Sequence, residues 1–175
     1  YTTLFRSRQR FLAQYQRMRE QGIRFVVASG NQYYQLISFF PEVAHEIAFV
    51  AENGGWVVSA GEDVFNCRMP QEHFNTVIDH LQTLTNIEII ACGKRSAYTL
   101  NQYNDELKAV AAKYYHRLEL VDDFNHIADD AILKFGLNVP DQLIPEIQPK
   151  LHAALGDMVT AVATGYGSIE IGRAS

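Results

Sequence analysis

The spacing of apolar residues predicts alternating helices and strands in the first part of the chain. Phe11, Tyr15 and Met18 share one helical face, which indicates a helix over 8–20 that ends before Gly22. An almost continuous apolar run over 23–28 is typical of a parallel strand covered on both faces. The elements predicted after it are a helix over 32–39, a strand over 47–51, and a hairpin of 56–59 with 64–67. This order is that of an open α/β sheet.

The pattern changes near Pro70, and we place a boundary between two units there. The helices predicted beyond it cover 72–84, 105–115 and 141–155, and the strands cover 87–92, 96–100, 132–139 and 159–163. Helices among short strands indicate a compact α+β unit over 70–164. The sequence Gly165-Tyr166-Gly167 is interpreted as a bend, and residues 165–175 are expected to return to the first unit.

The composition is that of an ordinary globular protein. Of 175 residues, 47% are hydrophobic and 20% are charged, and the net charge is -5. The absence of a basic block argues against nucleic acid as a partner. No apolar run approaches the roughly 18 residues of a membrane-spanning helix. The first residues lack a signal-peptide core, so we expect a cytoplasmic protein. The sequence does not indicate an oligomeric state.

The sequence contains no familiar metal or nucleophile motif. Cys67 and Cys92 are far apart and lack CxxC spacing, so two buried, reduced thiols are expected. Asp129-Asp130 lacks the spacing of a Ca²⁺ loop and is interpreted as a solvated turn. There is also no GxSxG elbow, no Walker-type loop and no Asp-x-Asp pair. The chain therefore offers neither a nucleophile nor a carboxylate cluster for a metal.

Three small polar residues, Ser29-Gly30-Asn31, follow the predicted strand over 23–28. Ligands of open α/β sheets bind beyond the carboxyl ends of strands. Ser29 offers a hydroxyl there, and Gly30 allows a phosphate to approach the backbone. The alternative is that Asn31 merely caps the next helix while Gly30 relieves the turn. Asn53 follows the next strand and would share this edge of the sheet, where it is a candidate to order the site or contact the substrate, although Asn-Gly is also a common turn dipeptide.

Together these segments resemble the haloacid dehalogenase superfamily, and more closely its Cof-type sugar phosphatases. The resemblance is carried by "GIRFVVASGN", "QYYQLISFF", "FVAENG", "ACGKRSAY", "ILKFGLNVPD" and "TGYGSIE". It implies a three-layer Rossmann-like core with a parallel sheet, of which residues 8–69 form part, and an inserted α+β cap over 70–164. Ser29 matches the Ser or Thr of the family's second motif, whereas Asn31 stands where many relatives carry Arg.

The resemblance also implies a function. Family members hydrolyse phosphorylated sugars through an aspartyl-phosphate, using Mg²⁺, a DxDGT nucleophile motif and a GDxxND motif. Neither motif occurs in this sequence, so the chain is expected to be inactive as given, without catalytic or metal-binding residues of its own. Substrate recognition is expected from four cap residues, namely Lys94, Arg95, Tyr98 and Lys134. The alternatives are that these are surface or packing residues, and that the chain is a non-catalytic α+β ligand-binding or interaction module.

Both ends of the chain depart from the family pattern. Residues 1–7 can be encoded by a widely used sequencing adaptor, and the reverse complement of that adaptor reads through residues 171–175. We therefore expect both segments to be non-native and to pack poorly, and the chain to be an internal fragment. The edge of the sheet beside 23–28 would then be open.

Overall fold

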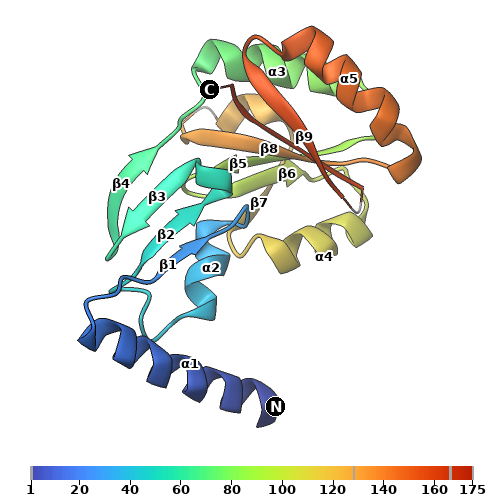
Figure 1. The fold of residues 1–175 in the computed structure, drawn as a ribbon. Coiled ribbons are helices and arrows are strands. Elements are labelled where there is room, and N and C mark those ends of the chain that lie inside the picture. Colours follow the sequence, from blue (N-terminus) through green and yellow to red (C-terminus); the bar gives the residue numbers. More distant parts are fainter. Residues whose placement is uncertain (1, 128, 166, 175) are drawn as a thin grey trace.

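The computed structural model describes residues 2–127, 129–165 and 167–174 and consists of two sheets with helices packed on them (Figure 1). The predicted bend at Tyr166 and the two terminal residues lie outside this part of the chain. The first sheet has four strands in the order β1-β2-β3-β4, and the second has six in the order β7-β6-β5-β8-β10-β9. We call the parts built on these sheets the four-stranded unit and the six-stranded unit.

The four-stranded unit contains helices and strands close to the predicted ones. Its elements are α1 (Thr2–Glu20), β1 (Val26–Ala28), α2 (Tyr33–Phe39), β2 (Ala48–Ala51), the 3₁₀ helix η1 (Glu52–Gly54), β3 (Trp56–Ser59) and β4 (Glu62–Asn66). Strands β1 and β2 are parallel, whereas β2, β3 and β4 pair with their neighbours in antiparallel fashion. The sheet therefore combines one parallel pair with a hairpin extension.

A cluster of buried side chains joins α1 and α2 to this sheet. Tyr15 of α1, Leu36 of α2 and Phe49 of β2 are among its buried members. Strand β1 is less covered than predicted, because Val26 is 49% exposed while Val27 packs against the cluster. The prediction that both faces of this strand are covered is therefore wrong. Within the part of the chain that the structure describes, β1 pairs with β2 alone, which leaves the expected open edge.

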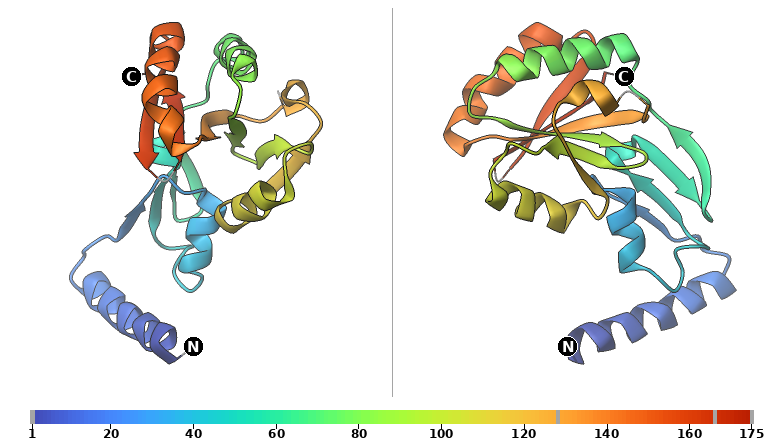
Figure 2. Two further views of the ribbon diagram at one scale, coloured as in Figure 1. Left: turned by 90° about the vertical axis from the view of Figure 1, so that its right-hand side faces the viewer. Right: turned by 180° about the vertical axis from the view of Figure 1, so that it is seen from behind.

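The six-stranded unit is mostly antiparallel, with one parallel pair between β6 and β7. Its elements are α3 (Gln71–Thr83), β5 (Glu88–Gly93), β6 (Ala97–Leu100), α4 (Asp105–Tyr114), β7 (Leu118–Val121), η2 (Phe124–Ile127), β8 (Ile132–Asn138), η3 (Asp141–Leu143), α5 (Ile144–Leu155), β9 (Val159–Gly165) and β10 (Ser168–Arg173). Helices α3 and α5 lie on one face of the sheet and α4 lies towards the other, while α1 is at the far end of the molecule (Figure 2).

Alternation of side chains along the strands separates the two faces of this sheet. The buried cluster between this sheet and helices α3 and α5 is the larger core of the protein. Helix α3 buries Phe74, Val77 and Leu81 in it at helical spacing. On the opposite face Ala111 of α4 packs with Ile90 of β5. The predicted helices over 72–84 and 105–115 are therefore confirmed, and their apolar faces are those that the periodicity indicates.

Strands β7 and β10 were not predicted, and β10 changes the organisation of the chain. It pairs with β8 and β9, so residues 168–173 extend the six-stranded sheet and do not return to the first unit. Ile169 and Ile171 are fully buried in the larger core, because alternate residues of β10 face α3 and α5. Poor packing is therefore wrong for Ile171. At the other end, residues 2–7 continue the backbone of α1, and Ser7 is exposed.

The two units meet where α2 lies beside α4 and β7. Gln32, which is 2% exposed, donates from Nε2 to the Arg117 carbonyl at 2.7 Å and accepts from the Arg117 amide at 2.9 Å. Gln35 donates to the Lys113 carbonyl at 3.0 Å. The Arg117 guanidinium carbon lies 3.7 Å from the centroid of the Tyr34 ring. Helix α2 is thus docked through polar groups that find defined partners.

We expect Gln32→Ala to destabilise the protein by about 2 kcal/mol, because two hydrogen bonds to the Arg117 backbone are lost. Urea titrations followed by circular dichroism measure this change in the free energy of unfolding. Gln82 is exposed on α3, so Gln82→Ala serves as the control and should leave the urea midpoint unchanged. Equal effects of the two substitutions would contradict the docking role of Gln32.

Candidate functional site

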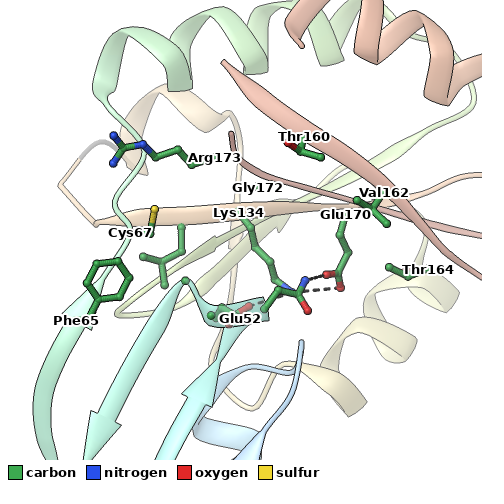
Figure 3. Close-up of a pocket in the computed structure, with 14 residues that line it drawn as sticks. Glu52, Phe65, Cys67, Lys134, Thr160, Val162, Thr164, Glu170, Gly172 and Arg173 are labelled. Atoms are coloured by element: carbon green, nitrogen blue, oxygen red, sulfur yellow. Dashed lines mark hydrogen bonds and ion pairs between the residues drawn. The ribbon is translucent and has the colours of Figure 1, made fainter. Parts of the chain in front are cut away.

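A buried lysine joins the two units next to the loop formed by Ser29, Gly30 and Asn31, which we call the Ser29–Asn31 loop. Lys134 of β8 is 3% exposed, and its Nζ lies 3.1 Å from Glu52 Oε2 and 3.2 Å from Glu170 Oε1 (Figure 3). The same ammonium donates to the carbonyl oxygen of Gly30 at 2.7 Å. One cation therefore contacts both units.

The neighbouring carboxylates keep this ammonium charged. Burial acts to lower the pKa of Lys134, but Cys92, Glu52 and Glu170 raise it above its ordinary value of 10.5. Burial raises the pKa of Glu52, and Lys134 opposes that shift. Burial also raises the pKa of the Cys92 thiol to about 12, so this thiol is neutral at physiological pH. Both thiols are free, as expected, although Cys67 is only half-buried.

The loop at the carboxyl end of β1 is closed by its own polar groups. The Ser29 hydroxyl accepts a hydrogen bond from the Asn31 amide at 3.2 Å. Gln32 occupies the cap position of α2, and its side chain bonds to Arg117 instead of to α2. The alternative role of Asn31 as a helix cap is therefore wrong. Its side chain donates to Gln35 Oε1 at 2.7 Å.

Asn53 lies against the loop, which is the shared edge that the sequence predicts. A Cβ on Gly30 would lie 2.5 Å from Asn53 Oδ1, so a larger residue here would displace the Asn53 side chain. The Asn53 side-chain amide donates to Glu170 of β10. Glu52 and Asn53 have φ angles of 52° and 57°, in the left-handed region that few non-glycine residues adopt. Such backbone strain is concentrated at functional sites.

A cavity of about 390 Å³ opens beside these residues, between η1 and strands β9 and β10 (Figure 3). We call it the η1 cavity. Its polar lining includes Glu52, Lys134, Thr160, Glu170 and Arg173. A space of this size, with a few convergent polar groups, is typical of small-ligand sites.

The turn between β5 and β6 lies apart from this cluster. Lys94 pairs with Asp63 of β4, so it ties the two units together at another place. The Arg95 side chain is 63% exposed. Tyr98 is 3% exposed in the larger core, which matches the packing alternative and not a substrate contact. Of the four predicted recognition residues, Lys134 is the one that the structure brings to the loop.

Asp130 holds that turn in place. Its carboxylate is buried and accepts from the Arg95 amide at 2.9 Å and from the Tyr98 hydroxyl at 2.9 Å. Burial raises the pKa of Tyr98, and the hydrogen bond to Asp130 raises it further. The prediction of a solvated turn is therefore wrong for Asp130, because its carboxylate accepts hydrogen bonds from donors that would otherwise be buried without partners.

Glu52 and Glu170 belong to the site, although neither was predicted. Glu52 comes directly before Asn53 at the end of β2, where only the amide was considered. Glu170 stands between two isoleucines, and this alternation is the ordinary pattern of a strand with one buried face, so it does not distinguish Glu170 from an exposed residue. No local signal in the sequence indicates its contact with Lys134.

The described residues do not form a Mg²⁺ site by themselves. Across 2–127, 129–165 and 167–174, no group of three His, Cys, Asp or Glu side chains is placed to hold a metal ion. Glu52 and Glu170 both contact the Lys134 ammonium, which occupies the position that a cation would take.

None of the helices in the described part has the length and apolar character that crossing a bilayer requires.

Lys134→Met should destabilise the protein by about 3 kcal/mol, because Glu52 is left as a buried charge without its partner. Urea unfolding measures this loss. Adding Glu52→Gln to Lys134→Met should recover part of it, since the buried charge is then removed.

Lys150→Met is the matched control for that substitution. Lys150 pairs with Glu146 on the surface of α5, where both side chains are more than half exposed. An exposed pair of this kind contributes little, so the urea midpoint should not change. If Lys134→Met behaved like this control, the proposed link between the sheets would be refuted.

Comparisons with known proteins agree with this fold. The profile of the haloacid dehalogenase-like hydrolase family matches residues 5–175. The chain is 63% identical over 165 residues to the 5-amino-6-(5-phospho-D-ribitylamino)uracil phosphatase YbjI of Escherichia coli. This match covers 94% of the chain and 60% of the relative, so the chain spans about 60% of the length of that curated protein.

Solved structures extend the agreement to the backbone. A protein from Streptococcus mutans superposes with a TM-score of 0.88 at 24% identity, covering 95% of this chain and 63% of that one. A haloacid dehalogenase-like hydrolase from B. subtilis gives a TM-score of 0.74 at 13% identity, with coverages of 90% and 64%. At such identities the similarity concerns the fold, and it confirms the predicted α/β class with a partial Rossmann-like core. The chain belongs to the haloacid dehalogenase-like hydrolase family.

Proposed function

We propose that this chain supplies the phosphoryl-binding loop and the cap of a phosphatase that acts on phosphorylated small molecules. The observation that carries the proposal is the contact of the Ser29–Asn31 loop with Lys134, in the junction between the units. Membership of the family and the phosphatase at 63% identity support the reaction class. In this proposal the boundary lies near Pro70, and the six-stranded unit is the cap.

Each residue of the loop has a distinct proposed role. The Ser29 hydroxyl donates to a phosphoryl oxygen, the backbone N–H of Gly30 adds a further donor, and the Asn31 N–H orients the Ser29 hydroxyl by donating to its oxygen. Lys134 positions the loop through the Gly30 carbonyl, while Glu52 and Glu170 compensate its charge. Asn53 and Glu170 hold the cap against the loop.

The remaining chemistry is assigned to motifs that this sequence does not contain. We propose hydrolysis through an aspartyl-phosphate, as the family resemblance implies, with the nucleophilic Asp in DxDGT and further Mg²⁺ ligands in GDxxND. When bound, Mg²⁺ neutralises charge on the phosphoryl oxygens. The residues of this chain contribute binding and positioning.

The proposed substrate is a phosphorylated sugar or a compound with a sugar-derived chain. The name of the Escherichia coli relative specifies a phosphorylated ribityl chain, which is such a group. The net charge of -5 gives no reason to add nucleic acid as a partner. We propose a cytoplasmic location.

Ser29→Ala tests the role of the loop. In an enzyme that carries this chain together with DxDGT and GDxxND, turnover should fall by about 10²-fold, as it does when an oxyanion donor is removed. Ser38→Ala is the control, because Ser38 is exposed near the end of α2. Steady-state kinetics with a phosphorylated sugar provide the measurement, and unchanged kinetics for Ser29→Ala would reject the assignment.

The same enzyme also separates the proposal from the alternative of a non-catalytic module. We expect the purified chain, as given, to release no phosphate from sugar phosphates even with Mg²⁺, and the enzyme with both motifs to release it. A non-catalytic module predicts release by neither protein. Metal-dependent turnover by the chain alone would contradict the assignment of the nucleophile to DxDGT.

A further inference from the structure

A second cavity adjoins the Ser29–Asn31 loop itself. It has a volume of about 330 Å³ and lies between this loop, α4, β8 and β10. We call it the α4 cavity. Gly30, Asn31 and Gln32 line one end of it, whereas the lining of the η1 cavity includes 52–55 and no residue of the loop. A ligand whose phosphate lies at the loop therefore reaches the α4 cavity directly.

The wall that α4 contributes to this cavity is apolar. It is formed by Leu107, Val110, Ala111 and Tyr114, which are spaced three or four residues apart and so share one helix face. Val110 is 43% exposed and Tyr114 is 57% exposed. Covering such surface with a planar ring removes apolar area from water and permits stacking on the tyrosine.

Polar groups lie at the side of the cavity nearest the loop. The Glu170 carboxylate accepts from Lys134 and from Asn53. An ionised carboxylate has about four acceptor positions, so Glu170 retains capacity for a ligand donor. Gly136 also shapes this side, because a Cβ there would lie 3.2 Å from the Tyr115 hydroxyl. The cavity therefore presents hydrogen-bond acceptors next to an apolar wall.

We infer that the α4 cavity binds the end of the substrate opposite its phosphate, and that this end is a planar, nitrogen-containing ring whose N–H groups donate to Glu170. The inference rests on the proposed function, since it takes the phosphate to lie at the loop. A simple sugar phosphate would leave Val110 and Tyr114 in water, whereas a ring on a phosphorylated chain covers them. The name of the Escherichia coli relative contains a uracil ring, which belongs to this class.

Calorimetric titration of this chain with 5-amino-6-(D-ribitylamino)uracil, a ring on an unphosphorylated chain, tests the inference. Tyr114→Ala should raise the Kd about 10-fold, because the stacking partner is lost. Val110→Trp should raise it at least as much by filling the cavity. Val162→Trp is the matched control, since Val162 is exposed in the η1 cavity, and its Kd should equal that of the unsubstituted chain. Circular dichroism shows whether each variant is folded. If Val110→Trp does not fold, the Kd of Tyr114→Ala alone decides the test.

Several outcomes would overturn the inference. They are absence of binding, an unchanged Kd for Tyr114→Ala, equal weakening by Val162→Trp, and equal binding of D-ribitol, which has no ring. Inorganic phosphate, titrated with and without Ser29→Ala, tests the loop separately. Ser29-dependent phosphate binding without ring binding leaves the proposed function standing and removes this inference. Tyr114-dependent ring binding without phosphate binding removes the proposed function and leaves the ring site.

Discussion

A lysine that is almost fully removed from water requires charge compensation from its surroundings. In this chain the ammonium of Lys134 contacts Glu52, Glu170 and the carbonyl of Gly30. These acceptors come from both units, so one cation fixes the position of the loop after β1 relative to β10. The arrangement of the two units around this point depends on that constraint, and the polar docking of Gln32 reinforces it.

The same constraint places the candidate binding surfaces. The Ser29–Asn31 loop lies in the junction between the units, where it adjoins the α4 cavity, whereas Lys134 lines the η1 cavity and Glu170 lines both. Ligand sites occur preferentially at such junctions. A molecule bound there contacts both units, so its affinity depends on the spacing that Lys134 maintains. Stability and recognition are therefore linked through one side chain.

The parts of this structure that follow from local patterns could be predicted from the sequence. Helices α3 and α4 and strand β8 have clear hydrophobic periodicity, and Ser29 and Asn53 follow strands whose ends meet at one edge. The rest depends on contacts between distant positions. Asn53 and Glu170 are 117 residues apart, and no local pattern relates them. The burial of Asp130 likewise depends on donors from another turn. Strand β10 was not predicted because residues 171–175, which include its end, were expected to be non-native.

The protonation state of Lys134 is the property that tests this arrangement most directly. Its ¹³Cε resonance can be followed by NMR as the pH is raised. Because the folded-state pKa is raised, the contribution of Lys134 to stability is complete below the ordinary value of 10.5 and is lost as the pH passes the folded value. We predict that Lys134 remains protonated at pH 10.5, where an unperturbed lysine is half deprotonated. Deprotonation of Lys134 at or below that pH would contradict its place between the two carboxylates.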